Sequence, residues 1–194
     1  MTDSVYQRVL GHEFDNLRPE LQAYFRGGGV GVATGVFEIA GSRVRVLRPL
    51  LAYLAWRRIL FPEYARDVPF EVTNTPTPDG GLDAVRTFRL PGRDRSLEDS
   101  MRVVDGELHE FLGRRRGLEV RLRLTVTDGL LRIRSDRQWL HLGRARIPLP
   151  RIATVTVTES WTDGSQHVDV RLASPLVGEW FRYAGSFSYR YVER

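Results

Sequence analysis

The chain of 194 residues contains no cysteine. A disulfide framework, a thiolate metal site and a cysteine nucleophile are therefore excluded. The chain also lacks any apolar run near the roughly 18 residues that a transmembrane helix needs. Its first residues, MTDSVYQRVL, do not follow the basic-then-apolar order of a signal peptide. We therefore expect no integral membrane segment and a cytoplasmic location, and we expect no cofactor.

The basic residues are arginines, and they exceed the acidic residues to give a net charge of +5. GC-rich genomes also produce an arginine bias, and the arginines are spread along the chain rather than gathered in a tail. Arg114, Arg115 and Arg116 form the one dense run, where a turn between strands is expected. A solvated turn is the first interpretation, and contact with phosphates or an anionic surface is the alternative. No zinc-finger, homeodomain or RNP-type motif accompanies the run, so we expect no nucleic-acid partner.

The segment 1–60 is predicted to be helical with one strand. Apolar residues recur at helical spacing in two pieces between residues 4 and 25, and the second piece begins at Pro19. The glycines at 27–29 follow a helix and open a strand, the reverse of a dinucleotide-binding loop. The stretch 46–60 is the most helical, and we expect it to plug or cap a sheet, with an interfacial membrane anchor as the alternative.

The segment 69–191 is predicted to form an antiparallel β-barrel. Turn signals such as Asp105-Gly106 and Asp128-Gly129 recur roughly every 8–12 residues, without helices between them. This spacing is typical of an antiparallel meander, sandwich or barrel. The expected strands are 69–75, 82–90, 97–104, 106–112, 117–127, 129–135, 137–142, 152–161, 166–173 and 179–191.

These elements predict a single α+β domain over residues 1–194 that is mostly β. We expect a curved antiparallel sheet of about eight to ten strands that closes into a barrel or half-barrel. The N-terminal helices should pack on this sheet or plug it. Calycin-like barrels, which can hold one small ligand, are the nearest architectural analogy.

The strand at 117–127 alternates most cleanly between two faces. Leucine and valine occupy one face, and Glu119, Arg121 and Arg123 occupy the other. The apolar face is predicted to lie in a core and the charged face in water.

Other strands place charged side chains on their apolar faces. Glu159 shares a face with Val155 and Trp161, Arg86 shares one with Phe88, and Glu110 lies between leucines. A buried charge without a partner costs several kcal/mol of folding free energy. One interpretation is an ion pair between Arg86 and a carboxylate that sets the strand register. The alternative is a pocket in which one desolvated carboxylate acts as a general acid or base.

Aromatic side chains complete the predicted site. Tyr183 joins the polar lining, and Trp139 and His141 share one face of their strand, which makes His141 the best-placed pocket histidine. The histidines lack the spacing of a metal site, so no metal is expected, and no GxSxG nucleophile motif is present. The predicted ligand contacts are Trp161, Phe88, Trp139, His141, Phe181, Phe187 and Trp56.

Six segments carry a family resemblance: YQRVLG near the start, RDVPF at 66–70, Arg86 with Phe88, GELHEFLG at 106–113, IPLPR at 147–151, and HVDVRLASPLVGEWFRYAG at 167–185. Together they resemble the bacterial family called domain of unknown function four-one-six-six, from Tyr6 to about residue 185. The matching positions include Arg86, Ser100, Glu110, Pro148, Pro150, Glu159, Pro175, Gly178, Tyr183 and Gly185.

The resemblance implies no settled activity. Members look like stand-alone proteins or appendages to redox enzymes, which implies a role in small-molecule metabolism. The family usually has tryptophan two residues before the arginine, where this chain has Ala84. That departure leaves room in the pocket or reflects a specialised ligand.

The leading functional hypothesis is a pocket for a hydrophobic or amphipathic small molecule. Its catalytic form is a cofactor-free cyclisation or isomerisation of a polyketide-like substrate. In that form Arg86 binds an oxyanion or carboxylate, and Glu159 or Glu110 moves a proton. Tyr183 and Trp161 then shape the cavity. One alternative is a non-catalytic ligand carrier. The other is an accessory interaction domain for a metabolic oxidoreductase, and in that case the barrel of this chain should be filled by its own side chains.

Overall fold

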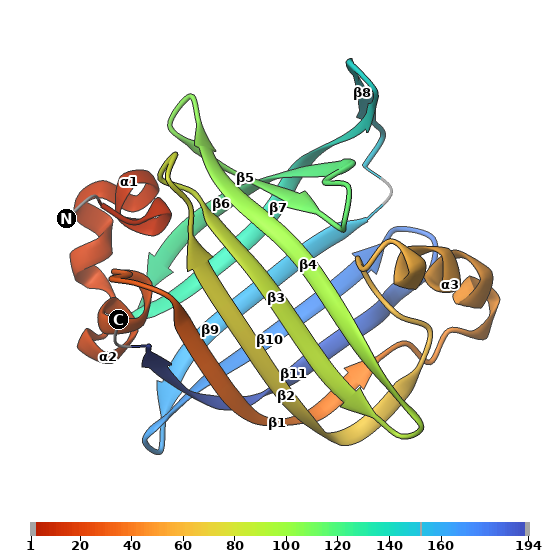
Figure 1. Cartoon of the computed structure of the whole chain (residues 1–194), viewed down its shortest axis with the longest axis horizontal. Helices are drawn as coiled ribbons and strands as arrows, with labels where there is room; N and C mark the ends of the chain where they lie inside the picture. Colours follow the sequence, from red (N-terminus) through yellow and green to blue (C-terminus); the bar gives the residue numbers. More distant parts are fainter. Residues whose placement is uncertain (1–2, 152, 193–194) are drawn as a thin grey trace.

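The computed structural model, which describes residues 3–151 and 153–192, is a closed antiparallel β-barrel (Figure 1). The strands are β1 (Gly31–Gly41), β2 (Tyr64–Pro76), β3 (Leu82–Leu90), β4 (Arg93–Val104), β5 (Glu107–Leu112), β6 (Leu118–Thr127), β7 (Leu130–Leu142), β8 (Ala145–Leu149), β9 (Thr154–Thr162), β10 (Ser165–Ser174) and β11 (Gly178–Tyr191). Ten of them form the ring in the order β6-β5-β4-β3-β2-β1-β11-β10-β9-β7, and β7 pairs with β6 to close it. The predicted mostly-β barrel is confirmed.

Aspartate–glycine pairs form several of the tight turns. In the turns at 105–106, 128–129 and 163–164, the aspartate has a φ of 51° to 53° and the glycine a φ of 74° to 78°. Positive φ at both central residues is typical of type I′ turns, whose twist matches that of the flanking strands. Each strand of the ring pairs with the next ring strand along the chain, with β9 following β7, so the ring is an up-and-down meander.

The first and last strands close the ring, because β1 pairs with β11 as well as with β2. Gly35 lies opposite Phe187, and Gly185 lies opposite Phe37. A Cβ atom on Gly35 would lie 2.0 Å from the carbonyl oxygen of Ser186, and one on Gly185 would lie 2.4 Å from the Cα of Phe37. Only glycine fits this close approach. The strand predicted within the first 60 residues is thus part of the barrel.

Short helices cover the two ends of the barrel (Figure 1). At one end lie α1 (Val5–Leu10), the 3-10 helix η1 (Gly11–Asn16) and α2 (Pro19–Phe25), and at the other lie the 3-10 helix η2 (Arg45–Leu47) and α3 (Arg48–Trp56). Ser4 and Gln7 form the capping box that begins α1, and Pro19 and Pro49 occupy the first turns of α2 and α3. Among residues 3–151 and 153–192, none of the helices could span a bilayer.

Some element boundaries differ from the prediction. The helix predicted over 46–60 ends at Trp56, since Arg58 adopts a left-handed φ of 58° and turns the chain so that Phe61 enters the core. The strand β8 was not among the expected strands, and Pro148 lies within it. Within the described chain β8 pairs with β7 alone, and such an edge strand tolerates proline. Residue 152, predicted to begin a strand, lies outside the described residues.

The predicted strands 129–135 and 137–142 form one strand, β7, interrupted by a β-bulge. Arg121 of β6 pairs with Arg137, and the next residue of β6 pairs with Ser135, so Asp136 is the extra residue. A bulge of one residue exchanges the two faces of a strand beyond it. The inward positions of β7 are therefore odd-numbered before Asp136 and even-numbered after it, as Ile133 and Gln138 show.

Two hydrophobic clusters form the core. One joins α1, η1 and α2 to β4–β7 and includes Tyr6, Leu10, Phe25, Met101 and Val120. The other contains Leu51 of α3 and is rich in aromatic rings, of which Phe37 and Phe70 stack with centroids 4.2 Å apart. The further aromatic members of this second cluster are Phe61, Phe88, Trp180, Phe181 and Phe187.

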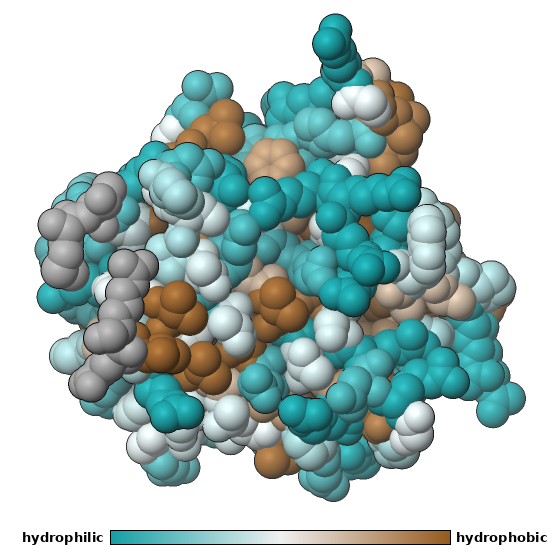
Figure 2. All heavy atoms as spheres, viewed as in Figure 1, coloured by the Kyte–Doolittle hydropathy of each residue, from teal (hydrophilic) through white to brown (hydrophobic). Residues whose placement is uncertain are grey.

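Hydrophilic groups cover most of the outer face in Figure 2, with apolar side chains gathered left of centre. Arginines and acids alternate over the exterior, as where Arg121 donates hydrogen bonds to both Glu107 and Asp136. Arg116, from the dense arginine run, forms an ion pair with Asp83 at 2.7 Å. The positive charge of the exterior is therefore interleaved with carboxylates rather than concentrated.

Candidate functional site

A cavity of about 1290 Å³ lies in the barrel. Its wall consists mainly of apolar side chains from inward strand faces, such as Val120, Val155 and Phe187. The lining also includes exposed residues, among them Leu50 of α3 and Asp79 in the β2–β3 turn. Ligand pockets measure roughly 300–1,000 Å³. The barrel therefore has more unfilled space than a typical small-molecule site requires.

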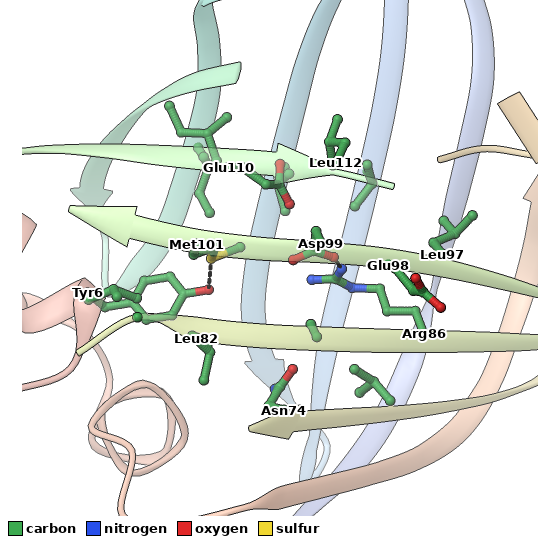
Figure 3. A pocket seen from close by; sticks show the side chains of 18 of the residues that line it. Tyr6, Asn74, Leu82, Arg86, Leu97, Glu98, Asp99, Met101, Glu110 and Leu112 are labelled. Carbon is green, nitrogen blue, oxygen red and sulfur yellow. Dashed lines mark hydrogen bonds and ion pairs between the residues drawn. The ribbon is translucent and has the colours of Figure 1, made fainter. Parts of the chain in front are cut away.

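Charged side chains line this cavity from four strands. Arg86 lies on β3, Asp99 on β4, Glu110 on β5 and Glu159 on β9. Figure 3 shows Arg86 reaching Asp99, with which it forms a hydrogen-bonded ion pair. Asp99 lies opposite Ala84, so the pair is diagonal across adjacent strands. The side chain of Asp99 is 2% exposed. The side chain of Arg86, which lines the cavity, is 21% exposed.

Asp99 was missed in the sequence, although its signal was present. Leu97, Asp99 and Met101 all line the cavity from β4, with the same alternation that indicated Arg86 on β3. Applying that alternation to the predicted strand 97–104 would have found it. The carboxylate that pairs with Arg86 is thus neither Glu110 nor Glu159 but one from the neighbouring strand.

Burial changes the acidity of the two glutamates. Desolvation raises the pKa of Glu159 to about 7, although a hydrogen bond from the Gln166 amide and the charge of Arg86 both lower it. Desolvation also raises the pKa of Glu110, again opposed by Arg86. A carboxyl group with a pKa near 7 can both donate and accept a proton at neutral pH. Glu159 is therefore chemically suited to proton transfer.

Five tyrosines line the cavity: Tyr6 of α1, Tyr24 of α2, and Tyr183, Tyr189 and Tyr191 of β11. Burial raises the pKa of all five, that of Tyr183 to about 12. The Tyr6 hydroxyl contacts the Met101 sulfur at 3.5 Å (Figure 3), and the Asn74 amide donates to the Tyr24 hydroxyl at 3.5 Å. At neutral pH the hydroxyls keep their protons and can donate hydrogen bonds. Tyr6 and Tyr24 carried no sequence signal, since helical spacing does not show which strands a helix meets.

The predicted aromatic contacts occupy different places. Phe187 lines the cavity. Phe88 and Phe181 lie within the aromatic cluster, 0% and 1% exposed, and do not line the cavity. Trp161 packs against the cluster formed with α1 and α2, and Trp56 is 59% exposed at the end of α3. Alternation along a strand predicts the face of a residue but not its position along the barrel axis.

Trp139 and His141, predicted in the pocket, lie on the outer face beside Glu119, because the bulge at position 136 exchanges the faces of β7. Arg146 of β8 donates two hydrogen bonds to Glu119, at 2.9 and 2.6 Å, and its guanidinium lies 4.0 Å from the centre of the Trp139 ring. His109 and His141 each contact the same carboxylate at 2.6 Å. Glu119 is therefore only 3% exposed, whereas the sequence predicted it in water.

This outer cluster holds β8 against the barrel. Burial raises the pKa of Glu119, but hydrogen bonds from Arg146, His141 and His109 outweigh it and lower the pKa to about 2. The carboxylate is therefore ionised and saturated with donors. Within residues 3–151 and 153–192, no group of three or more His, Asp or Glu side chains is arranged to hold a metal ion.

Comparisons with known proteins cover nearly the whole barrel. The family model described as "Domain of unknown function (DUF4166)" matches residues 17–187. The chain is similar to the "Uncharacterized protein YndH" of Bacillus subtilis (strain 168), with 29% identity over an alignment of 199 residues. The alignment covers 95% of this chain and 96% of that protein. No solved structure matches significantly. Because the family model spans the ring from β1 to β11 and includes Arg86, Asp99, Glu110 and Glu159, the chain belongs to the DUF4166 family.

Proposed function

We propose that this protein binds a hydrophobic or amphipathic small molecule inside the barrel. The observation that carries the proposal is the cavity of about 1290 Å³ with an apolar wall and one group of ionisable side chains. Burial of a hydrocarbon body against that wall contributes roughly 25 cal/mol per Å². The charged group then orients the polar end of the molecule. A barrel that served only as an interaction domain would be filled by its own side chains.

A cavity-filling substitution tests this proposal. Ala84 is 3% exposed and lines the cavity from β3, so a larger side chain there would occupy cavity space. Ala84→Trp should lower the affinity for the neutral apolar dye Nile red roughly tenfold, measured by fluorescence titration. The matched control is Val85→Trp at the next position, which is 43% exposed on the outer face and should leave binding unchanged. If both folded variants bind the dye as the wild type does, the proposal is wrong.

A second candidate function is acid–base catalysis on the bound molecule, favoured by the pKa of Glu159 near 7. A cofactor-free isomerisation or cyclisation needs a positioned substrate and a group that moves a proton. Glu159 or Glu110 would move the proton. Tyr183 would donate to the developing oxyanion, since Arg86 is already paired with Asp99.

Hydrogen exchange separates catalysis from simple carriage. An alkyl methyl ketone bound in the cavity should exchange its α-hydrogens for deuterium in D₂O faster with the wild type than with Glu159→Gln. Mass spectrometry measures the rate, and Nile red binding shows that the variant still folds. Equal rates for the two proteins would favour a carrier without catalytic function.

A further inference from the structure

We infer that the bound molecule carries a protonated amine at its polar end, so that the barrel takes a cationic amphiphile. This inference rests on the proposed function. Its geometric basis is Asp99, which lines the cavity with a side chain only 2% exposed. One carboxylate oxygen accepts from Arg86, and the other, Oδ2, has no hydrogen-bond partner in the described chain. A buried acceptor without a donor is unfavourable, and an ammonium group would supply that donor.

The balance of charge in the cavity wall also favours a cation. Three carboxyl groups, those of Asp99, Glu110 and Glu159, face the cavity from the strands, against the single guanidinium of Arg86. The remaining charged groups of the described lining do not change this balance. Two exposed arginines of the lining are matched by two exposed aspartates: Arg8, Arg26, Asp3 and Asp79. Glu98 forms an ion pair with Arg58.

An anionic ligand would be disfavoured by the same groups. A carboxylate entering the wall would meet three carboxyl groups and a guanidinium already paired with Asp99. Electrostatic repulsion is strong where water is scarce. The role of oxyanion or carboxylate binder that the sequence suggested for Arg86 is therefore not the one this geometry favours.

The same groups make amine binding depend on pH. In the empty cavity Glu159, with a pKa of about 7, and Glu110, with a raised pKa, retain protons at mildly acidic pH. A bound ammonium favours their ionised forms, so binding releases protons and strengthens as pH rises from roughly 5.5 to 8. An alkyl amine stays protonated throughout, with a pKa near the value of about 10.4 for lysine. The five tyrosines of the lining, Tyr6, Tyr24, Tyr183, Tyr189 and Tyr191, stay neutral because burial raises their pKa values.

Ligands with one alkyl chain and different polar ends test the inference. Decylamine, decanol and decanoate are titrated into the full chain by calorimetry at about pH 7.5, in two buffers of different ionisation enthalpy. We expect decylamine to bind roughly tenfold more tightly than decanol and decanoate to bind most weakly, with proton release for the amine alone. Decanoate binding as tightly as decylamine would overturn the inference and leave the proposed function standing. Absence of binding by all three would overturn both.

Substitutions in the wall give the second arm of the test. Asp99→Asn keeps the shape, removes a charge and leaves Arg86 available, so decylamine affinity should fall roughly tenfold while decanoate affinity rises. Glu110→Gln is the second interior variant and should also weaken decylamine binding and reduce proton release. Asp94→Asn is the control, because Asp94 has 55% of its side chain exposed on β4 and does not line the cavity. Unchanged decylamine affinity in the folded interior variants would overturn the inference.

Discussion

At the scale of single residues, the cavity wall concentrates ionisable groups where water is limited. Arg86 and Asp99 offset each other as an ion pair, whereas Glu159 has only the Gln166 amide as a hydrogen-bond donor in the described structure. A buried ion pair adds little net stability, but an incompletely compensated carboxyl group changes its proton affinity instead. The acid–base character of the site therefore lies mainly in the glutamates.

Glu159→Gln should change how stability depends on pH. Folding raises the pKa of Glu159 from 4.5 to about 7, so the folded state holds this proton more tightly than the unfolded state does. The wild type then loses stability as pH rises from about 4.5 to 7, and the full penalty applies above that range. Because glutamine cannot ionise, the variant should be about 3 kcal/mol more stable than the wild type near pH 8.

Urea unfolding across this pH range measures the effect. The two proteins should be nearly equal in stability close to pH 4.5, where the wild-type carboxyl is protonated in the folded state. Glu13→Gln, a change at an exposed position in η1, is the matched control and should follow the wild type. A constant difference between Glu159→Gln and the wild type at every pH would contradict the role given to burial.

At the scale of elements, the pairing of β1 with β11 decides whether the barrel closes. The strands approach so closely at Gly35 that a Cβ there would overlap the backbone of Ser186 and Phe187. Gly35→Ala should therefore lower the free energy of unfolding by about 2 kcal/mol or more, measured by denaturant unfolding. Gly28→Ala, where a Cβ meets nothing within 4 Å, should change it by less than about 0.5 kcal/mol. Equal effects of the two substitutions would show that the pairing of β1 with β11 accommodates the added methyl group.

At the scale of the whole molecule, closure gives each ring strand two neighbours within the ring and leaves β8 paired with β7 alone in the described residues. β11 also contains the buried Trp180, Phe181 and Phe187, whereas four of the five residues of β8 are exposed. Amide hydrogen exchange should therefore be slowest in β11 and its neighbour β1, and fastest among the strands in β8. Hydrogen–deuterium exchange with mass spectrometry measures this order. Similar protection of β8 and β11 would contradict it.

The local features of this protein follow from short stretches of its sequence. Period-two alternation gave the inward faces on which Arg86, Glu110 and Glu159 lie, and aspartate–glycine pairs located the turns. These features are predictable because the direction of a side chain along a strand, and the backbone freedom of glycine, depend on neighbouring residues alone.

Which of those residues meet depends instead on how distant segments of the chain pair and pack. The extra residue at position 136 moved Trp139 and His141 to the outer face, and β8 then buried Glu119. The meeting of Arg86 with Asp99, and the entry of tyrosines from α1 and α2 into the lining, depend on strand register and helix docking. These are relations between segments far apart in the chain, which alternation within one segment cannot determine.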